Sequence, residues 1–399
     1  MPASVAIVGA GPAGAALGYL LARRGIDVHV LERQTDFDRE FRGEGLMPSG
    51  IDAIRQMGLG DAFDALPQVT VRRLRLFQER RQIFELDFEA IVSGPRFVSQ
   101  PALLEMFAKE ASQFGSYRLD RGFTVRDLVR DGDRVVGVRG DHQGGSSLVR
   151  ADLVIGADGR ASIVRKRSSL DRMRNEPVFD VVWFQVPLPD FWDDHVRFFL
   201  DRGHFAIAFP SPHGGLQFGW IIQKGSFGEL RKRSIEEWVE ALRSHVPEDL
   251  ADHLGRCGDD LRRPFLLDVQ CDHLVEWSEP GVFLFGDAAH PMSPVGGQGI
   301  NIALRDSLVA ANHLVPALTQ GEGIEHACRA ICNERLPEIR TIQDLQQRAP
   351  RVLFLGSPAV RAVVRHVLPL AARTGLAQLV GGFLFRRFAE GTTDVRLRV

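Results

Sequence analysis

A glycine-rich hexapeptide, GAGPAG, lies near the N-terminus and consists of Gly9, Ala10, Gly11, Pro12, Ala13 and Gly14. It follows a short β-branched run at 5–8 and precedes apolar residues at helical spacing over 15–24. In this context Gly9 permits a tight turn, Gly11 lets the backbone approach a pyrophosphate, and Gly14 lets a helix pack closely on a strand. The positive end of that helix favours phosphate charge. The hexapeptide therefore predicts a dinucleotide site and leaves the choice between NAD and FAD open.

Three acidic residues follow runs that are typical of buried strands. Glu32, with Arg33 beside it, ends the second apolar run and is placed to accept hydrogen bonds from an adenosine ribose. Asp158 stands in the motif GADG after a third apolar run, and Asp287 follows Gly286 at the end of the run GVFLFG. Each acid is a candidate for binding a polar ligand.

Asp287 is followed by a turn rich in Pro and Gly, HPMSPVGGQG, and then by a helix-like segment. This stretch places many backbone amides with little side-chain cover next to a carboxylate. Amides at a helix N-terminus stabilise negative charge. This arrangement predicts one ligand that contacts both the acid and the amides.

The alternation of strand, helix and strand over 5–32 is a βαβ unit, which implies a parallel sheet. The segment 71–88 is predicted to be a hairpin that interrupts this rhythm, and a helical pattern returns over 101–114. Strand-rich sequence fills 178–224, and we expect one amphipathic helix over 227–246. The patterns predict an α/β chain with a Rossmann-like nucleotide-binding domain, an inserted mixed β-sheet domain and C-terminal helices.

Composition excludes several classes of function. The 399 residues carry a formal net charge of −2, so there is no overall electrostatic case for a nucleic-acid partner. No apolar run reaches the roughly 18 residues needed to span a bilayer, and the N-terminus lacks the pattern of a secretion signal. The four cysteines form no CxxC pair, so we expect ordinary thiols, no metal site and a reducing, cytoplasmic environment.

The hexapeptide, the segment DLVIGADGRASIVR and the stretch GVFLFGDAAHPMSPVGGQGIN resemble, in order and spacing, the group A flavoprotein monooxygenases, the para-hydroxybenzoate hydroxylase-like family. The resemblance covers most of residues 1–345. It implies non-covalently bound FAD, with NADH or NADPH as a transient reductant that needs no domain of its own. It also implies an FAD-binding domain over 1–70, 97–175 and 272–345, a substrate domain over 71–96 and 176–271, and a C-terminal helical segment over 346–399.

The family pattern gives Asp287 and the turn after it a common ligand. It implies that Asp287 hydrogen-bonds a ribityl hydroxyl of FAD and that Pro294 lies beside the isoalloxazine ring. It implies that the N1–C2 carbonyl edge of the flavin faces the backbone amides of Gly297, Gln298, Gly299, Ile300 and Asn301. That edge becomes negative when the flavin is reduced, so a helix N-terminus there stabilises the reduced cofactor.

Three further cofactor contacts are implied by the resemblance. Arg42 matches the segment that reaches the phosphate or ribityl region, and Gln100 matches a residue that contacts the cofactor. Asp158 is expected to serve both FAD and the visiting NAD(P)H.

The resemblance implies that NAD(P)H reduces FAD, that O2 adds at flavin C4a, and that the hydroperoxide transfers one oxygen atom to a small molecule. The inserted strands are rich in aromatic residues and are expected to form the wall of the substrate site. An aromatic or polyketide-like substrate fits this composition best. The aromatic residues singled out for the wall are Phe184, Phe198, Phe205, Phe218 and Trp220.

Hydroxylation of a phenol benefits from a base that forms the phenolate. Tyr19 and Tyr117 are the only tyrosines, and neither lies in the inserted region. His204 and His213 are therefore the candidate bases, unless the substrate is already activated.

Three alternatives remain open. A flavin-dependent halogenase shares the FAD-binding half, but its WxWxIP signature is matched here only by FGWIIQKG. A geranylgeranyl-reductase-like enzyme has a cysteine soon after the second strand, whereas the first cysteine here is Cys257. An accessory protein that binds flavin without turnover would use the same glycines and acids.

The segment from residue 345 onward carries nine Lys or Arg residues against two Asp or Glu residues. A basic amphipathic end is typical of contact with a membrane surface or a lipophilic substrate. A helical cap packed on the FAD-binding domain is the favoured interpretation. The sequence gives no indication of oligomeric state.

Overall fold

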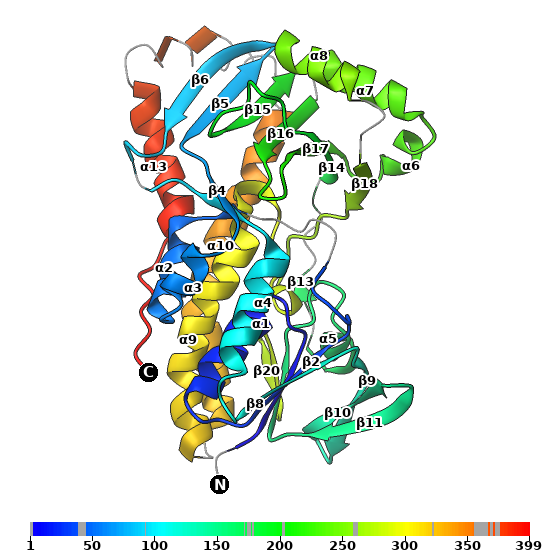
Figure 1. The fold of residues 1–399 in the computed structure, drawn as a ribbon. Coiled ribbons are helices and arrows are strands. Elements are labelled where there is room, and N and C mark those ends of the chain that lie inside the picture. The colour runs from blue at the N-terminus through cyan, green and yellow to red at the C-terminus, as the bar shows by residue number, and fades with distance from the viewer. Residues whose placement is uncertain are drawn as a thin grey trace.

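The computed structural model describes residues 3–38, 45–91, 93–170, 172–173, 177, 179–201, 204–257, 262–320, 323–354, 366–367, 370–371 and 376–399. Figure 1 shows a lower part, which holds the N-terminal strands, and an upper part built on a second sheet. The long helices α9 (Gln298–Gln320) and α10 (Ile324–Phe354) pack against each other, and α10 reaches the upper part. Among the described residues, no helix combines the length and apolar character needed to cross a bilayer.

The lower sheet consists, within those ranges, of six strands in the order β20-β21-β12-β1-β2-β8. Their bounds are β1 Val5–Val8, β2 Val28–Glu32, β8 Tyr117–Arg121, β12 Leu153–Gly156, β20 Ser278–Glu279 and β21 Val282–Leu284. All neighbours pair in parallel except β20, which runs antiparallel to β21. Every residue of β1, β12 and β21 is buried, as expected for parallel strands covered on both faces. The predicted Rossmann-like α/β arrangement is confirmed.

Shorter elements surround the lower sheet. The helices are α1 Pro12–Arg23, α2 Pro48–Gln56, α3 Gly60–Asp64, α4 Gln100–Ala111 and α5 Ile163–Arg167, and the 3-10 turns are η2 Gly286–Ala288 and η3 Val295–Gly297. An antiparallel meander at the lower right of Figure 1 is formed by β9 Thr124–Asp131, β10 Arg134–His142 and β11 Gly145–Arg150. Two small sheets pair β7 Arg96–Val98 with β3 Gly45–Leu46 and β4 Gln68–Thr70, and β13 Arg172–Met173 with β19 His273–Leu274.

The upper sheet contains, as far as the structure describes it, seven strands in the order β18-β14-β17-β16-β15-β5-β6. Their bounds are β5 Arg73–Gln78, β6 Arg81–Asp87, β14 Phe179–Pro187, β15 His195–Asp201, β16 His204–Pro210, β17 Gly215–Gln223 and β18 Arg262–Leu267. β5 and β6 form the predicted hairpin, and β5 pairs in parallel with β15. Two segments that are far apart in sequence therefore share one mixed sheet, as predicted for the inserted strands.

The helix expected over 227–246 is wrong, because the chain forms two helices there. α6 (Phe227–Leu230) ends before Ser234, and α7 (Ile235–Arg243) begins after it. Ser234 Oγ accepts a hydrogen bond from the Glu237 N–H at 3.3 Å, and a Glu237 carboxylate oxygen accepts from the Ser234 N–H at 2.9 Å. This capping box starts a new helix. α7 and α8 (Glu248–Arg256) then cover one face of the upper sheet.

The C-terminal segment is helical only in part. α10 continues without a break past residue 345, and α13 (Leu376–Glu390) packs against α2 and β6. Residues 391–399 form no helix, which corrects the expectation of helices over this stretch. The outer face of α13 leaves the side chains of Leu379, Val380 and Phe383 exposed.

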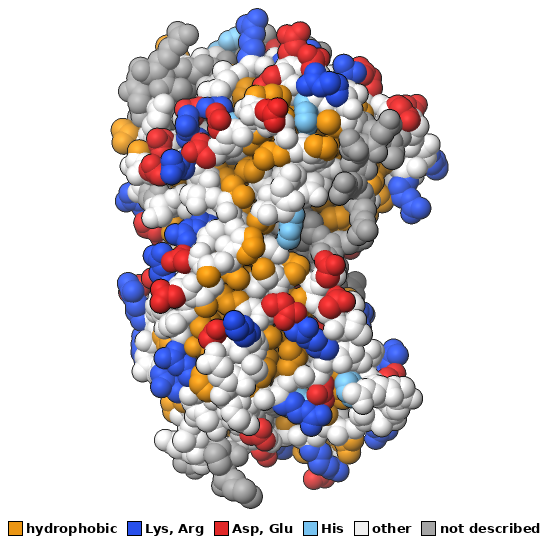
Figure 2. Space-filling model, in the orientation of Figure 1, with side chains coloured by type: hydrophobic (Ala, Val, Ile, Leu, Met, Phe, Trp, Pro, Cys, Tyr) orange, Lys and Arg blue, Asp and Glu red, His pale blue; other side chains and the backbone are white. Residues whose placement is uncertain are grey.

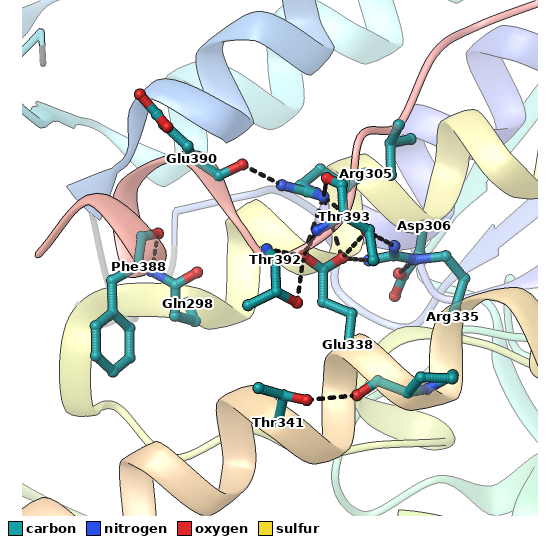
Figure 3. A network of polar contacts seen from close by, with 12 residues as sticks. Gln298, Arg305, Asp306, Arg335, Glu338, Thr341, Phe388, Glu390, Thr392 and Thr393 are labelled. Carbon is teal, nitrogen blue, oxygen red and sulfur yellow. Dashed lines mark hydrogen bonds and ion pairs between the residues drawn. The ribbon is translucent and has the colours of Figure 1, made fainter. Parts of the chain in front are cut away.

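Buried charged side chains of α9 and α10 bind residues 390–393, at the end of α13 and just after it (Figure 3). On α10, Arg335 pairs with Glu338 at 2.5 Å and with Asp306 of α9 at 2.5 Å. Glu338 also pairs with Arg305 at 3.0 Å and accepts a hydrogen bond from the Thr392 N–H at 2.7 Å. Burial is the largest single effect and raises the pKa of Glu338. The nearby charges of Arg335 and Arg305 and the hydrogen bond from the Thr392 N–H together outweigh it, so the pKa lies below its ordinary value.

The Glu338→Gln variant is expected to lose about 3–5 kcal/mol of unfolding free energy at neutral pH, because it leaves buried arginines short of a partner. The contribution of Glu338 is fully present above about pH 4.3, its unfolded pKa, and is lost as the pH falls through the lower folded pKa. The difference in unfolding free energy between wild type and variant should therefore decrease as the pH is lowered, and urea unfolding measures it. The control is Glu334→Gln on the same helix, where the side chain is 44% exposed. Equal losses in both variants would contradict the prediction.

Candidate functional site

Four parallel strands bring the sequence motifs to one edge of the lower sheet. The ends of β21, β12, β1 and β2 are in register with one another. The hexapeptide follows β1, Glu32 ends β2, Asp158 follows β12, and Asp287 follows β21. In open α/β sheets, ligands bind beyond the carboxyl ends of the strands. The fold therefore gathers all the motifs at the edge where a ligand is expected.

The three glycines of the hexapeptide have different surroundings. Gly9 has φ +100°, and a Cβ there would lie 2.5 Å from the Ala157 carbonyl oxygen. A Cβ on Gly14 would lie 2.0 Å from the Gly9 carbonyl oxygen, so α1 packs directly on the turn. Gly11 has φ −68° and ψ 179°, and no atom of the described chain lies within 4 Å of its Cβ position. Gly9 and Gly14 are thus required by the fold, whereas Gly11 leaves open space at the positive end of α1.

Glu32 is buried and holds this turn in place. One carboxylate oxygen accepts a hydrogen bond from the Ala10 N–H at 2.8 Å, and the other accepts from the Gln34 N–H at 2.9 Å. The carboxylate therefore joins the hexapeptide to the end of β2, an effect that the sequence did not reveal. The contact of Glu32 with a ribose stays a prediction, and Arg33 beside it is exposed.

The Asp158 carboxylate binds the first turn of α5, whose N-cap residue is Ser162. The carboxylate accepts hydrogen bonds from Ser162 Oγ at 2.5 Å and from the N–H groups of Ile163 at 2.6 Å and Val164 at 3.2 Å. Burial raises the pKa of Asp158, and these hydrogen bonds oppose the rise. The proposed contacts of Asp158 with FAD and NAD(P)H stay predictions.

Two arginines connect the Asp158 motif to Asp287. The Arg165 guanidinium donates to the carbonyl oxygens of Ala288 at 2.6 Å and Arg160 at 2.5 Å. Arg160 Nε in turn lies 3.3 Å from an Asp287 carboxylate oxygen, and the Asp287 side chain is 34% exposed. Asp287 is therefore charge-balanced and still accessible to a ligand. Arg160 was not predicted from the sequence, where its only signal is its position directly after GADG.

The loop at 291–297 leads into α9. Gly296 and Gly297 have φ +73° and +61°, in the left-handed region that favours glycine. Pro294, which precedes them, is partly buried. α9 begins at Gln298, and the first N–H groups of a helix have no partner within it. No described atom lies within 4 Å of a Cβ placed on Gly299, so there is open space beside the first turn of α9.

Asn301 and Ile300 complete the first turn of α9. The Asn301 side chain is fully buried, and its Oδ1 accepts a hydrogen bond from the Met47 N–H at 2.8 Å. Its Nδ2 donates to the Gly297 carbonyl oxygen at 2.7 Å. Ile300 is partly buried. The backbone contact of these residues with a flavin stays a prediction, whereas the Asn301 side chain visibly holds the loop.

The remaining predicted residues lie in different places. Gln100 is buried at the first position of α4. His204 is the first residue of β16, and its backbone lies opposite that of Asp201 in β15. His213 lies in the exposed turn between β16 and β17. Arg42 lies outside the described residues. The contacts predicted for all four stay predictions.

The five aromatic residues predicted for the substrate wall lie on two different faces of the upper sheet. Phe184, Phe218 and Trp220 lie on the face of the upper sheet that α7 and α8 cover, and the rings of Phe184 and Phe218 stack with centroids 5.0 Å apart. They belong to a closed core. Phe198 and Phe205 lie on the opposite face, as do residues that the sequence analysis missed. The sequence could not show which face each residue occupies, because these strands are apolar on both faces and lack a polar–apolar alternation.

The opposite face of the upper sheet packs towards the 291–297 loop. Its core includes Phe97, whose ring stacks on Phe209 with centroids 4.3 Å apart, and Val295 of that loop packs against this core. Several of its apolar side chains remain partly exposed: Leu74, Phe84, Phe198, Phe205, Ile207, Phe265 and Leu267. Figure 2 shows a band of hydrophobic side chains down the middle of the molecule, with charged side chains on both sides.

The donors and open spaces of this edge fit FAD. The space at Gly11 and the N-terminus of α1 suit a pyrophosphate, and the accessible Asp287 carboxylate suits a hydroxyl donor. The start of α9, with open space at Gly299, suits a ring that becomes negatively charged. One cofactor could use all of these features.

A family model described as "FAD binding domain" matches residues 2–344. The chain belongs to this family. The chain is also 31% identical over 400 residues to a 6-methylpretetramide 4-monooxygenase of Streptomyces rimosus. The match covers 99% of this chain and 94% of that protein. This chain is an FAD-dependent monooxygenase.

Solved structures show the same fold at lower identity. The crystal structure of Pseudomonas aeruginosa PqsL in complex with 2-aminobenzoylacetate matches with a TM-score of 0.79 and 22% identity, covering 91% of this chain and 99% of that one. The p-nitrophenol 4-monooxygenase PnpA of Pseudomonas putida matches with a TM-score of 0.80 and 19% identity, covering 98% and 99%. Flavin-dependent halogenases also share the fold below 25% identity, which is no evidence for their activity here.

The Gly11→Ala variant of this FAD-binding chain is expected to fold normally but to bind FAD about tenfold or more weakly, because overpacking costs roughly 1–3 kcal/mol. The backbone of Gly11 suits any L-residue, so a new methyl group would meet only the ligand. Fluorescence titration of apoprotein with FAD measures the affinity, and thermal unfolding of the apoprotein checks the fold. Gly115→Ala is the control, since its Cβ position is also open and lies in an exposed turn. Equal FAD affinity in both variants would rule out a phosphate contact at Gly11.

Proposed function

We propose that this monooxygenase inserts one oxygen atom into a planar, largely apolar aromatic or polyketide-like molecule, bound between the 291–297 loop and the upper sheet. The observation that carries the proposal is the face of that sheet on which apolar side chains stay partly exposed beside Val295. Partly exposed apolar groups around a cofactor site are typical of a binding wall for an apolar ligand. The name of the Streptomyces relative supports an aromatic polyketide substrate and a place in secondary metabolism.

Bound FAD supplies the redox chemistry: it accepts a hydride from NADH or NADPH and activates O2 for transfer of one oxygen atom. The chain supplies position and electrostatics. The N-terminus of α9 stabilises negative charge near the loop, and the Asp287 carboxylate accepts hydrogen bonds from hydroxyl groups of the cofactor. The apolar face of the upper sheet orders the substrate and excludes water from the reacting atoms.

Other assignments belong to the same proposal. Separate sheets support the division into an FAD-binding domain and a substrate domain at the residue ranges given above. The substrate face includes no tyrosine, so a phenolic substrate would be deprotonated by a histidine such as His204 or His213, or would arrive activated.

The activity itself is tested by following NADH and NADPH oxidation in air with a panel of polycyclic and monocyclic aromatic compounds. We expect a yellow protein whose reductant consumption is stimulated by planar aromatic compounds, with a product one oxygen atom heavier by mass spectrometry. Dependence on chloride or bromide, with a halogenated product, would instead establish a halogenase. Stimulation by no aromatic compound would contradict the proposed substrate class.

The location of the substrate is tested with one variant on each face of the upper sheet. Ile207→Trp fills the partly exposed face and is expected to weaken substrate-stimulated turnover at least about tenfold, as overpacking costs roughly 1–3 kcal/mol. FAD binding should be unchanged. Phe184→Leu, on the face covered by α7 and α8, should lower thermal stability by about 1–3 kcal/mol while leaving KM unchanged. A changed KM in Phe184→Leu, with no change in Ile207→Trp, would place the substrate on the face covered by α7 and α8 and contradict the proposal.

A further inference from the structure

The backbone carbonyl groups of the 291–297 loop are almost all held by hydrogen bonds. Within the loop, Pro294 accepts from the Gly297 N–H at 3.0 Å. Side-chain amides hold the carbonyl oxygens of Pro291, Ser293, Val295, Gly296 and Gly297. Four side chains from two helices provide these amides: Gln298 and Asn301 of α9, and Gln343 and Gln346 of α10. None of the four was singled out from the sequence for its side chain.

Gln346 makes the largest number of these contacts. Its Nε2 donates to the carbonyl oxygens of Ser293 at 2.9 Å and Val295 at 2.8 Å, and its Oε1 accepts from the Ser293 N–H at 3.2 Å. The side chain is fully buried. Gln343 lies one turn earlier on the same face of α10 and donates to the Pro291 carbonyl oxygen at 3.2 Å.

Gln298 holds the other end of the loop. Its Nε2 donates to the Gly296 carbonyl oxygen at 2.9 Å and to the Phe388 carbonyl oxygen at 3.0 Å, and the second of these bonds is drawn in Figure 3. The Gln298 side chain is also buried. The loop is thus held between α10 on one side and the end of α13 on the other.

Fixing a carbonyl group fixes the direction of the next N–H group. A trans peptide unit is planar, so its C=O and N–H bonds point in opposite directions. The hydrogen bonds to Val295 and Gly297 therefore turn the N–H groups of Gly296 and Gln298 away from the buried amides. Left-handed glycines are the residues whose peptide units rotate most freely, so the direction needs an external restraint.

We propose that Gln346 and Asn301 are positioning residues. By holding the carbonyl oxygens of Val295 and Gly297, they orient the next N–H groups, those of Gly296 and Gln298, to stabilise negative charge on reduced FAD. This rests on the proposed function, because it requires the flavin ring to lie beside this loop. Neither side chain needs to touch the cofactor. Their effect is electrostatic and acts through the backbone, and it should favour the reduced over the oxidised cofactor.

The test is Gln346→Met, which keeps the volume of the side chain and removes its hydrogen bonds. We expect FAD to remain bound, while its preference for the reduced form falls about tenfold, equivalent to a two-electron potential lower by about 30 mV. Equilibration with reference dyes measures the potential. The control is Gln347→Met, the next residue on α10, whose side chain contacts Cys271 Sγ at 3.7 Å; its potential should match that of wild type.

The outcomes separate this inference from the proposed function. If wild type binds FAD and Gln346→Met loses thermal stability without a change in potential, the glutamine is merely structural and the inference is wrong. If Gln346→Met does not fold, Asn301→Leu decides, because it removes the hydrogen bond to the Gly297 carbonyl oxygen. The same drop in potential supports the inference, and an unchanged potential overturns it. If wild type itself fails to bind FAD, the proposed function fails as well.

Discussion

The alignment of four parallel strand ends is the constraint on which the rest of the structure depends. Because β21, β12, β1 and β2 end in register, a glycine turn, an aspartate that binds the first turn of α5 and an accessible aspartate meet at one edge although they are up to 278 residues apart (Gly9 to Asp287). Hydrogen bonds then join the motifs to one another, through Glu32 to the glycine turn and through Arg165 to Ala288. The edge is therefore a single connected framework and not a set of independent loops.

Two kinds of polar group inside the protein have different functions in this framework. Buried charges bind whole segments to each other, as Glu338 and Arg335 do for α9, α10 and the chain after α13. Buried neutral amides, such as Gln346, instead set the direction of single peptide units without adding charge near the site. A charged side chain in the same position would add its own field to the loop, so the neutral amides leave the electrostatics to the backbone.

The sequence predicted the features that depend on local backbone requirements. The hexapeptide, Asp287 and the hairpin at 71–88 have fixed spacings or clear periodicities, and each was located correctly in the chain. The faces of the upper sheet could not be assigned, because Phe184 and Phe198 stand in strands that are apolar on both sides. The network around Arg335 and Glu338 was also invisible, since its members are brought together only by packing. The break before α7 had a readable signal, Ser234 followed three residues later by Glu237, which the helical periodicity of the segment obscured.

The attachment of residues 390–393 to the network has a consequence for the order of folding during synthesis. Arg305 donates hydrogen bonds to the carbonyl oxygens of Glu390 at 2.7 Å and Thr393 at 2.6 Å. Glu390 and Thr393 are synthesised some 85 residues after Arg305. A nascent chain that already contains α9 therefore lacks two of the hydrogen-bond acceptors of Arg305. Domains generally fold as units while the chain emerges from the ribosome. The buried Arg305 therefore gains its full set of partners only after residue 393 has been synthesised.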